Sequence, residues 1–304
     1  MKKLSVNIES IRNQYGIPRM LEICSEAGFD AIDFDLSLYG SNSDAEKIYE
    51  RDDDGITEYF SRIKERAAEL GLFVGQTHGR FRIHQPDEDF NILMRELSRK
   101  DLLATAALGA PFCVIHNVAS GFFPDATAEF MHEKNNAFFR DITPFAERYG
   151  VSFALETFGD SQANGKRIID FFGDALELKK SFDSISTKNK ALCMDTGHTN
   201  KAASAAAENG FSVLGVADAI RLFGKDLKVL HLNDNNGFSD QHTFPGSFGS
   251  FGGIDWHSVF EALADVGYDG TYNFELTLSK YGNYLEKAVK FLGGYLRAFI
   301  DGKL

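Results

Sequence analysis

The chain has 304 residues, of which 43% are hydrophobic and 25% are charged, so it contains enough apolar material for a large buried core. Its 32 Lys and Arg against 44 Asp and Glu give a formal net charge of −12, which argues against a broad nucleic-acid-binding surface. The start, MKKLSVNIES, has no apolar stretch of signal-peptide length, and no run approaches about 18 consecutive apolar residues. We therefore expect a soluble, cytoplasmic protein with no membrane partner.

Strand-like and helix-like segments alternate along the whole chain. Eight short runs rich in β-branched, aromatic and small residues are predicted to be strands: residues 5–8, 31–36, 73–78, 112–117, 152–157, 191–196, 229–234 and 272–276. Among the helix-like stretches between them, 58–71, 90–110 and 130–150 end in Gly or Gly-Ala, which is typical of a helix C-terminus. Eight such pairs predict a single (β/α)₈ TIM barrel domain over residues 1–304, because a doubly wound open sheet usually needs fewer strands.

A side chain that can bind a metal stands at or near the end of six of these strands. The successive members are 38, 40, 39, 36 and 44 residues apart, which is the length of one strand plus one helix. The C-terminal ends of barrel strands meet at one mouth, so we expect one cluster of imidazoles and carboxylates. The six residues are His78, His116, Glu156, Asp195, His231 and Glu275.

Four of the six lie on the last four predicted strands: Glu156, Asp195, His231 and Glu275. Three carboxylates and one imidazole suit Mn²⁺, Mg²⁺, Co²⁺ or Zn²⁺, and ligand softness alone does not choose among these ions. Any one of the four alone could be an ordinary solvated residue at the barrel mouth. Four in the same register favour a site for one divalent metal.

Further candidates allow additional metals or substrate contacts. His78 and His116 could hold a second metal, or they could line a polyol pocket as hydrogen-bond donors. His198, together with Asp240 and His242 from the long loop after the seventh predicted strand, could form a third cluster. Alternatively, His198 contacts substrate and the two loop residues are solvated.

The loops after the third, fourth, fifth and seventh predicted strands are long and rich in Gly and Phe, and a barrel would place them at the mouth: 79–89, 118–127, 158–165 and 235–256. Arg80 and Arg82 could bind a phosphate or carboxylate, but we interpret them as surface charges. Loop aromatic residues could cover the C–H face of a sugar, although simple loop packing is favoured: Phe81, Phe122, Phe123, Phe244 and Trp256.

Two other residue groups are interpreted as structural. The cysteines are odd in number, lack the spacing of a metal site and are expected to be reduced, buried thiols: Cys24, Cys113 and Cys193. Three histidines lie outside the register of strand ends: His84, His132 and His257.

The strings ALET, CMDTGH, HLND, DQH, GGIDW and FEL, in this order and spacing, resemble the xylose-isomerase-like TIM-barrel superfamily. This group contains sugar-phosphate isomerases and epimerases, ketose 3-epimerases, inosose dehydratases and endonuclease IV. The resemblance covers nearly the whole chain, and the motifs are specific for the superfamily rather than for one of its members.

In the ketose-epimerase and isomerase branch, the resemblance implies that one divalent metal is held by Glu156, Asp195, His231 and Glu275. It also implies that Glu156 and Glu275 face each other across the substrate as the acid/base pair, and that His198 contacts a substrate oxygen. A homodimer or homotetramer is suggested by the same resemblance.

The resemblance to endonuclease IV implies a larger ligand set that would bind up to three zinc ions. The chain matches all of that set: His78, His116, Glu156, Asp195, His198, His231, Asp240, His242 and Glu275. It lacks convincing Arg- and Lys-bearing loops for a DNA backbone, so a nucleic-acid partner is not expected.

Our leading prediction is a metal-dependent isomerase or epimerase of a small sugar, sugar phosphate or polyol, acting by proton abstraction next to a carbonyl. One alternative is an endonuclease IV-like phosphodiesterase with a multinuclear zinc site. Another is a keto-sugar dehydratase or lyase, because NDNNGFSDQH stands where epimerases typically have an Arg near the metal His. A sugar-binding or regulatory barrel without turnover is the non-enzymatic alternative.

Overall fold

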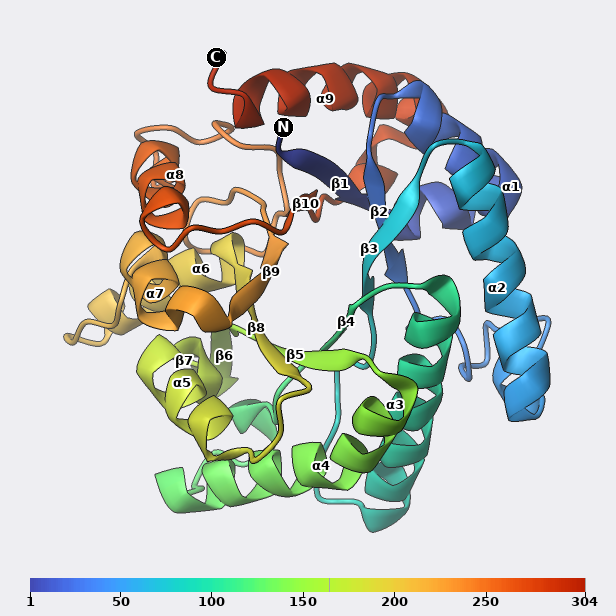
Figure 1. The fold of residues 1–304 in the computed structure, drawn as a ribbon. Helices are drawn as coiled ribbons and strands as arrows, with labels where there is room; N and C mark the ends of the chain where they lie inside the picture. Colours follow the sequence, from blue (N-terminus) through green and yellow to red (C-terminus); the bar gives the residue numbers. More distant parts are fainter. Residues whose placement is uncertain (164, 304) are drawn as a thin grey trace.

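Eight parallel strands form a nearly closed barrel in the computed structural model, which describes residues 1–163 and 165–303 (Figure 1). They are β1 (Lys3–Asn7), β2 (Ala31–Asp35), β3 (Phe73–His78), β4 (Phe112–Ile115), β5 (Ser152–Glu156), β8 (Lys190–Asp195), β9 (Leu227–His231) and β10 (Thr271–Phe274). Their hydrogen-bonded order is β10-β1-β2-β3-β4-β5-β8-β9, and a parallel bridge between Leu232 and Phe274 joins the two ends. This arrangement confirms the predicted α/β TIM barrel.

Helices surround the barrel (Figure 1). They are α1 (Glu9–Glu26), α2 (Asp53–Glu69), α3 (Glu88–Leu108), α4 (Ala128–Tyr149), α5 (Ala175–Ser184), α6 (Thr196–Glu208), α7 (Val216–Phe223), α8 (Trp256–Asp265) and α9 (Leu285–Ile300). Short 3₁₀ turns lie at Ile48–Glu50, Ser120–Phe122, Phe171–Gly173, Gly224–Asp226 and Leu278–Tyr284. Within the described residues, no helix is both long enough and apolar enough to cross a membrane.

Local sequence signals account for the ends of the longest helices. The side chains of Asp87 and Thr127 cap α3 and α4 by accepting a hydrogen bond from a backbone N–H in the first turn. Gly109 and Gly150 follow the same two helices with φ of 75° and 70°, a left-handed conformation that favours glycine. The predicted helices at 90–110 and 130–150 are therefore confirmed, and each begins two residues earlier than expected.

The side chains that point into the barrel differ between its two halves. Below the strand ends, those on β4, β5, β8 and β9 are small or apolar, and five of them form a buried cluster: Val114, Ala154, Ala191, Cys193 and Val229. On β10, β1, β2 and β3 the corresponding layer is polar and equally buried: Ser5, Asp33, Gln76 and Asn273. The interior of a TIM barrel is normally dominated by bulky branched apolar residues, so one half of this barrel departs from the usual composition.

The connection after β5 differs from the loop expected at 158–165. It contains an antiparallel hairpin of β6 (Asp160–Ala163) and β7 (Lys166–Ile169), and position 164 lies outside the described residues. An ion pair between Asp160 and Arg167 joins the two strands. The hairpin strands lack the alternation of apolar and polar residues that marks a half-buried strand, and the local signal that was missed is the Asn-Gly dipeptide at 164–165 of the sequence, which is typical of a two-residue hairpin turn.

Candidate functional site

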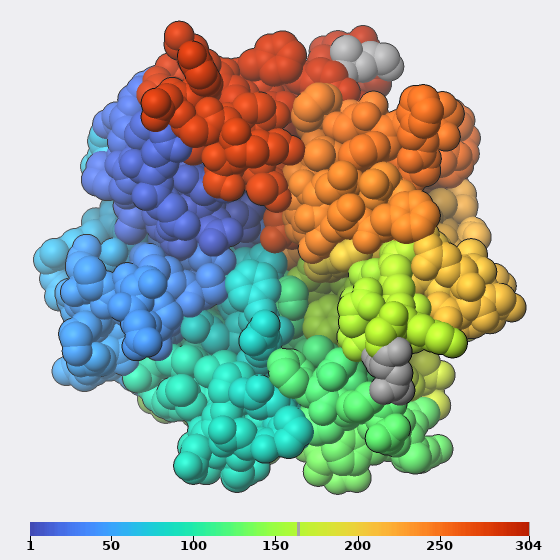
Figure 2. All heavy atoms as spheres, turned by 180° about the vertical axis from the view of Figure 1, so that it is seen from behind, coloured from blue at the N-terminus to red at the C-terminus, as the bar shows by residue number. Residues whose placement is uncertain are grey.

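The loops that follow the barrel strands gather at one end of the molecule. Figure 2 shows this face, which is hollowed at its centre between the loops after β3 (cyan), β5 (lime) and β9 (orange). The candidate residues lie at the strand ends beneath these loops. This is the end of the barrel at which TIM-barrel enzymes place their active sites.

Four side chains from consecutive strands meet at the centre of this mouth. Glu156 ends β5, Asp195 ends β8, His231 ends β9 and Glu275 directly follows β10. The Nδ1 atom of His231 lies 3.0 Å from Glu156 Oε1 and 3.0 Å from Glu275 Oε2. Each of the four residues offers one ligand atom, and these atoms all lie within 4.8 Å of one another. The structure thus brings together the four residues that the sequence proposes as ligands.

Two further histidines extend the cluster on one side. His78 ends β3 and His116 follows β4, and their Nε2 atoms are 3.3 Å apart. His116 Nε2 lies 2.9 Å from Glu156 Oε2, and His78 Nε2 lies 3.8 Å from the same oxygen. Glu156 therefore contacts both of these imidazoles as well as His231, and the ring of His78 also stacks on that of His231 at a centroid distance of 4.9 Å.

A third group lies on the other side of the cluster. Asp240 Oδ2 is 3.5 Å from His198 Nε2 and 3.3 Å from His242 Nε2. Its other oxygen lies 3.5 Å from Nζ of Lys201, so Asp240 also faces a cation of the protein. His198 and His242 each offer a ligand atom close to one of Asp195. All nine residues proposed from the sequence consequently lie in one connected cluster.

The CMDTGH and HLND motifs hold Asp195 in place. Asp195 Oδ1 accepts a hydrogen bond of 2.7 Å from the backbone N–H of His198, so the carboxylate also caps α6. Asp195 Oδ2 accepts one of 3.0 Å from Nδ2 of Asn233. With one lone pair of each oxygen used in this way, the carboxylate cannot rotate freely, which suits a ligand of fixed geometry.

Opposite charges stabilise the ionised forms at the centre of the cluster. Burial acts to raise the pKa of Glu156, but His231 and His116 outweigh it and hold the pKa well below its usual range. Burial also opposes ionisation of Glu275, whose pKa is lowered by His231 and His78. Burial would lower the pKa of His231, yet the surrounding acids raise it well above its usual range. The pocket therefore favours positive charge between its carboxylates.

The donor set fits a divalent metal ion. Glu156 Oε2 and Glu275 Oε2 lie 2.9 and 3.0 Å from imidazole nitrogens, but among the described residues neither buried oxygen has a partner at the angles of a hydrogen bond. Buried carboxylate oxygens are costly unless a cation or a hydrogen bond satisfies them. Three carboxylates and one imidazole are suitable ligands for Mn²⁺, Mg²⁺, Co²⁺ or Zn²⁺.

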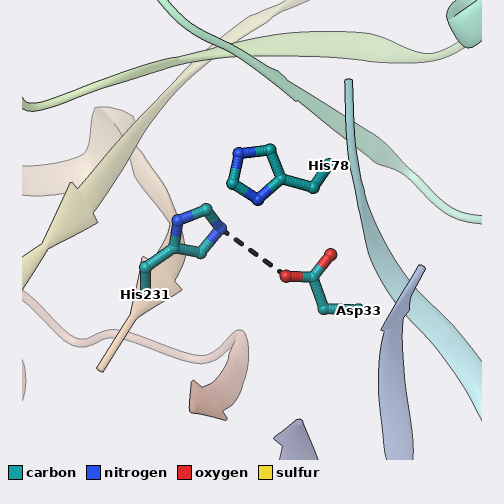
Figure 3. Close-up of side chains that lie close together, drawn as sticks. All are labelled: Asp33, His78 and His231. Atoms are coloured by element: carbon teal, nitrogen blue, oxygen red, sulfur yellow. Dashed lines mark ion pairs between the residues drawn. The ribbon is translucent and has the colours of Figure 1, made fainter. Parts of the chain in front are cut away.

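Sequence reasoning missed Asp33, a fully buried residue of β2. Figure 3 shows its carboxylate pointing toward His231, with His78 beside them, and Asp33 Oδ2 lies 3.7 Å from His231 Nε2. Burial raises the pKa of Asp33 to about 7. An acidic residue within the strand run AIDFDL was the available signal, because its alternate positions face the barrel interior.

The interpretation of Arg80 as a surface charge was wrong. Arg80 is buried, and its Nε and Nη2 atoms donate hydrogen bonds of 2.7 and 2.8 Å to the two carboxylate oxygens of Asp101. A single sequence did not reveal this pairing, because Asp101 lies in the middle of α3, 21 residues after Arg80. Arg82 is exposed, as predicted.

One loop aromatic residue lies over the cluster and others pack elsewhere. The ring centroid of Phe81 lies 4.7 Å from that of His78 and 4.9 Å from that of His116, and 42% of Phe81 is exposed. Phe244 packs edge-on against Tyr295, in agreement with the loop packing that was favoured. Phe81 is thus the aromatic side chain best placed to meet a bound molecule.

The cysteines and the histidines outside the strand-end register were interpreted as structural. All three cysteines are free and buried, as expected. His132 Nε2 lies 2.6 Å from Glu177, and His84 stacks on Phe123 at a centroid distance of 5.7 Å. These contacts fit the structural roles that were assigned to both histidines. Cys193, however, lies close to Glu156 and His231, and its sulfur atom could serve as a metal ligand together with these two residues.

Sequence comparison finds both a family and individual relatives. Residues 21–293 match the family described as Xylose isomerase-like TIM barrel. The uncharacterized protein MJ1311 of Methanocaldococcus jannaschii is 28% identical over 206 residues, which are 64% of this chain and 63% of that protein. The uncharacterized protein y4fM of Sinorhizobium fredii is 25% identical over 188 residues, 61% of this chain and 53% of that protein. The chain thus spans less than two thirds of these curated relatives.

Solved structures share the fold at low sequence identity. L-ribulose 3-epimerase matches with a TM-score of 0.72 and 21% identity, covering 100% of this chain and 95% of that one. A D-tagatose 3-epimerase-like protein matches with a TM-score of 0.71 and 19% identity over 100% of both chains. The IolI protein with a bound zinc atom matches with a TM-score of 0.69 and 17% identity, covering 99% and 98%. With its barrel and the match over residues 21–293, the chain belongs to the xylose isomerase-like TIM barrel family.

Proposed function

We propose that this protein is a divalent-metal-dependent isomerase or epimerase of a small sugar, sugar phosphate or polyol. The observation that carries the proposal is the position of Glu156 and Glu275, whose carboxylates lie 3.0 Å from the same nitrogen of His231 at the mouth of the barrel. The sugar epimerases among the structural neighbours support the substrate class, and the zinc atom in IolI supports a metal.

The four central residues would hold the metal: Glu156, Asp195, His231 and Glu275. A bound divalent ion would polarise the adjacent oxygens of a hydroxyketone and so reduce the free-energy cost of removing the proton on the neighbouring carbon. Glu156 and Glu275 come from strands on different sides of the mouth, and their low pKa values keep them ionised at neutral pH. One ionised carboxylate removes the proton, and the other carboxyl group, after taking up a proton from solvent, returns it to the deprotonated substrate.

The surrounding residues would orient the substrate. His116 places Nε2 2.9 Å from Glu156, where it can hydrogen-bond to a hydroxyl group of a sugar. His198 uses Nδ1 in a contact of 3.0 Å with the backbone carbonyl of Thr157, which leaves Nε2, on the side of Asp240, for a substrate oxygen. Phe81 lies over His78 and His116 and can cover an apolar C–H face. This division of polar and apolar contacts is typical of sites for small polyols.

The size of the cluster is compatible with the alternative predicted from the sequence, a phosphodiesterase with a multinuclear zinc site. The cluster contains three overlapping groups that could each hold an ion, and they share Glu156 and Asp195: His78 with His116, the central four, and His198 with His242. The net charge of −12 does not suit a nucleic-acid substrate, so the isomerase or epimerase is the first proposal.

Metal content per chain separates the two candidates. Elemental mass spectrometry on protein purified without chelator should find about one Mn, Co, Mg or Zn per chain for the isomerase or epimerase. Two or three zinc ions per chain would instead favour hydrolysis of a phosphodiester.

Proton exchange tests the chemistry. With ketose substrates in D₂O, the wild-type protein should incorporate deuterium next to the carbonyl, as read by NMR. Glu156→Gln and Glu275→Gln should each lower the rate by at least about 100-fold, because both bases are needed. Glu261→Gln, an exposed carboxylate of α8, is the matched control and should exchange at the wild-type rate. Full activity in either of the first two variants would refute the mechanism.

A further inference from the structure

The polar half of the barrel interior leads directly to one ligand of the proposed metal. Asp33 Oδ2 accepts hydrogen bonds from Nδ2 of Asn7 at 3.2 Å and from Nδ2 of Asn273 at 3.1 Å. Ser5 Oγ in turn donates to Asn273 Oδ1 at 2.9 Å. Each of these four side chains is at least 92% buried. Three neighbouring strands, β10, β1 and β2, thus hold the Asp33 carboxylate in a fixed position.

The two ring nitrogens of His231 face different groups. Nδ1 points at Glu156 and Glu275, 3.0 Å from each, whereas Nε2 points into the barrel toward Asp33. Within the described part of the chain, Asp33 is the one acidic group within 4.0 Å of Nε2, and Nε2 has no hydrogen-bond partner. The separation of 3.7 Å exceeds a hydrogen bond by about half an ångström.

A histidine can bind a metal through one nitrogen only when that nitrogen carries no proton. The remaining proton then resides on the other nitrogen, and an acceptor placed there fixes the tautomer and the orientation of the ring. For His231, ligation through Nδ1 requires the proton on Nε2, which faces Asp33.

We propose that Asp33 is a positioning residue, which accepts the Nε2 proton of His231 in a hydrogen bond and so presents Nδ1 as the ligand between Glu156 and Glu275. This inference rests on the proposed metal site and deepens it, because it names a residue outside the ligand set on which metal affinity depends. Asn7 and Asn273 complete the arrangement by holding the carboxylate in place. Asp33 itself takes no part in the transfer of substrate protons.

Zinc affinity of the metal-free protein tests this role without any substrate. Competition with a chromophoric chelator at pH 7 should show that Asp33→Asn binds the first zinc ion about 10- to 100-fold more weakly than the wild type. Asp170→Asn is the matched control, because Asp170 is also a buried, hydrogen-bonded acid but lies outside the cluster. Its zinc affinity should stay within about twofold of the wild type.

A second measurement uses the wild-type protein and does not depend on the folding of a variant. Long-range ¹H–¹⁵N correlation spectra of the histidine side chains, recorded with one equivalent of zinc, should show His231 protonated at Nε2 and metal-bound at Nδ1. A proton on Nδ1 would overturn the proposal. So would wild-type zinc affinity in Asp33→Asn, and the metal site would then stand without this positioning residue. Absence of zinc binding by the wild type would overturn both the metal site and the role of Asp33.

Discussion

Gly197, the second residue of α6, lies where there is no space for a side chain. A Cβ atom at this position would be 1.9 Å from Asn233 Oδ1 and 2.8 Å from Asn235 Nδ2. Asn233 donates the hydrogen bond that holds Asp195 Oδ2, so any displacement of Asn233 is passed on to Asp195. The glycine of CMDTGH therefore allows the first turn of α6 to approach the loop after β9, behind a proposed ligand.

Substitution of Gly197 should impair metal binding. We expect Gly197→Ala to weaken zinc binding by about 10-fold, because Asn233 must move away from Asp195, and to cost about 1–3 kcal/mol of stability through overpacking. Gly294→Ala in α9 is the control: a Cβ atom there would meet nothing within 4 Å beyond its own helix, so zinc affinity should not change. Chelator competition measures the zinc affinity, and urea unfolding measures the stability. Equal zinc affinities of Gly197→Ala and the wild type would contradict this account.

The end of β3 is joined to α3 and to the end of β2 by the buried ion pair of Arg80 and Asp101. Arg80 Nη2 also donates to the carbonyl of Leu36, which follows β2, and Tyr49 donates to Asp101 at 2.8 Å. His78 lies two residues before Arg80 in the same segment. These contacts therefore fix the end of β3, which carries His78, and the start of the following loop, which carries Phe81 over the cluster.

Removal of the cation from this pair should be strongly destabilising. Arg80→Met leaves the buried carboxylate of Asp101 without its partner and should lower the free energy of unfolding by about 3–5 kcal/mol. Arg82→Met, at an exposed position two residues away, should change it by less than about 0.5 kcal/mol. Urea unfolding of the two variants gives the comparison. Similar stabilities would mean that the ion pair contributes little.

Asp170 joins the loop after β4 to the end of the β6–β7 hairpin. Its Oδ2 atom accepts hydrogen bonds from the backbone N–H and the hydroxyl group of Ser120, both at 2.9 Å. Burial raises the pKa of Asp170 from 3.8 to about 6. The folded state thus favours the protonated form, and this contribution to stability is present below about pH 4 and is lost as the pH rises through 6.

The pH dependence of stability should reveal this group. Between pH 4 and pH 7.5, ionisation of Asp170 should lower the stability of the wild type by about 2.4 kcal/mol, since the whole pKa shift corresponds to about 3 kcal/mol and part of that is already lost at pH 4. Asp170→Asn cannot ionise, so its unfolding free energy relative to the wild type should rise by about that amount over the same interval. Urea unfolding at both pH values measures the change. A constant difference between the two proteins would contradict the assignment.

At the scale of the whole molecule, the proposed metal ligands lie on the last four strands of the barrel. β10 pairs with β1, and the bridge from Leu232 to Phe274 connects β9 to β10, so these strands complete the barrel. A metal held by all four would tie together the segment that closes it. Metal binding and barrel closure should therefore be coupled.

Removal of the metal should loosen that segment selectively. Free zinc at about 100 times its Kd should stabilise the fold by about 2.7 kcal/mol. Removal of the metal with a chelator should raise the rate of amide hydrogen exchange at the ends of β5, β8, β9 and β10 more than in β2. Hydrogen-exchange mass spectrometry gives the comparison. In Glu156→Gln, which lacks a proposed ligand, the chelator should change amide hydrogen exchange only slightly. A uniform change along all eight strands would argue against a local role for the metal.

Most of the fold was predictable because its signals are local. The alternation of strand-like and helix-like runs, the capping residues and the helix-ending glycines depend on neighbouring residues, and they predicted the eight barrel strands in the correct order. The β6–β7 hairpin was missed, since its short strands do not alternate apolar and polar residues and are joined partly by the ion pair of Asp160 with Arg167. The Asn-Gly dipeptide at positions 164–165 of the sequence was the local signal available for it.

The sequence by itself determined the barrel and the register that places a metal-capable residue at one strand end after another, because a parallel barrel brings all these ends to one mouth. Only the tertiary structure decided which side chains meet. Asp33 and His231 stand on β2 and β9, and Arg80 meets Asp101 on a helix, so neither pair appears in any local pattern. The physical reason is that burial and pairing of charges depend on contacts between distant segments, which form only when the barrel closes.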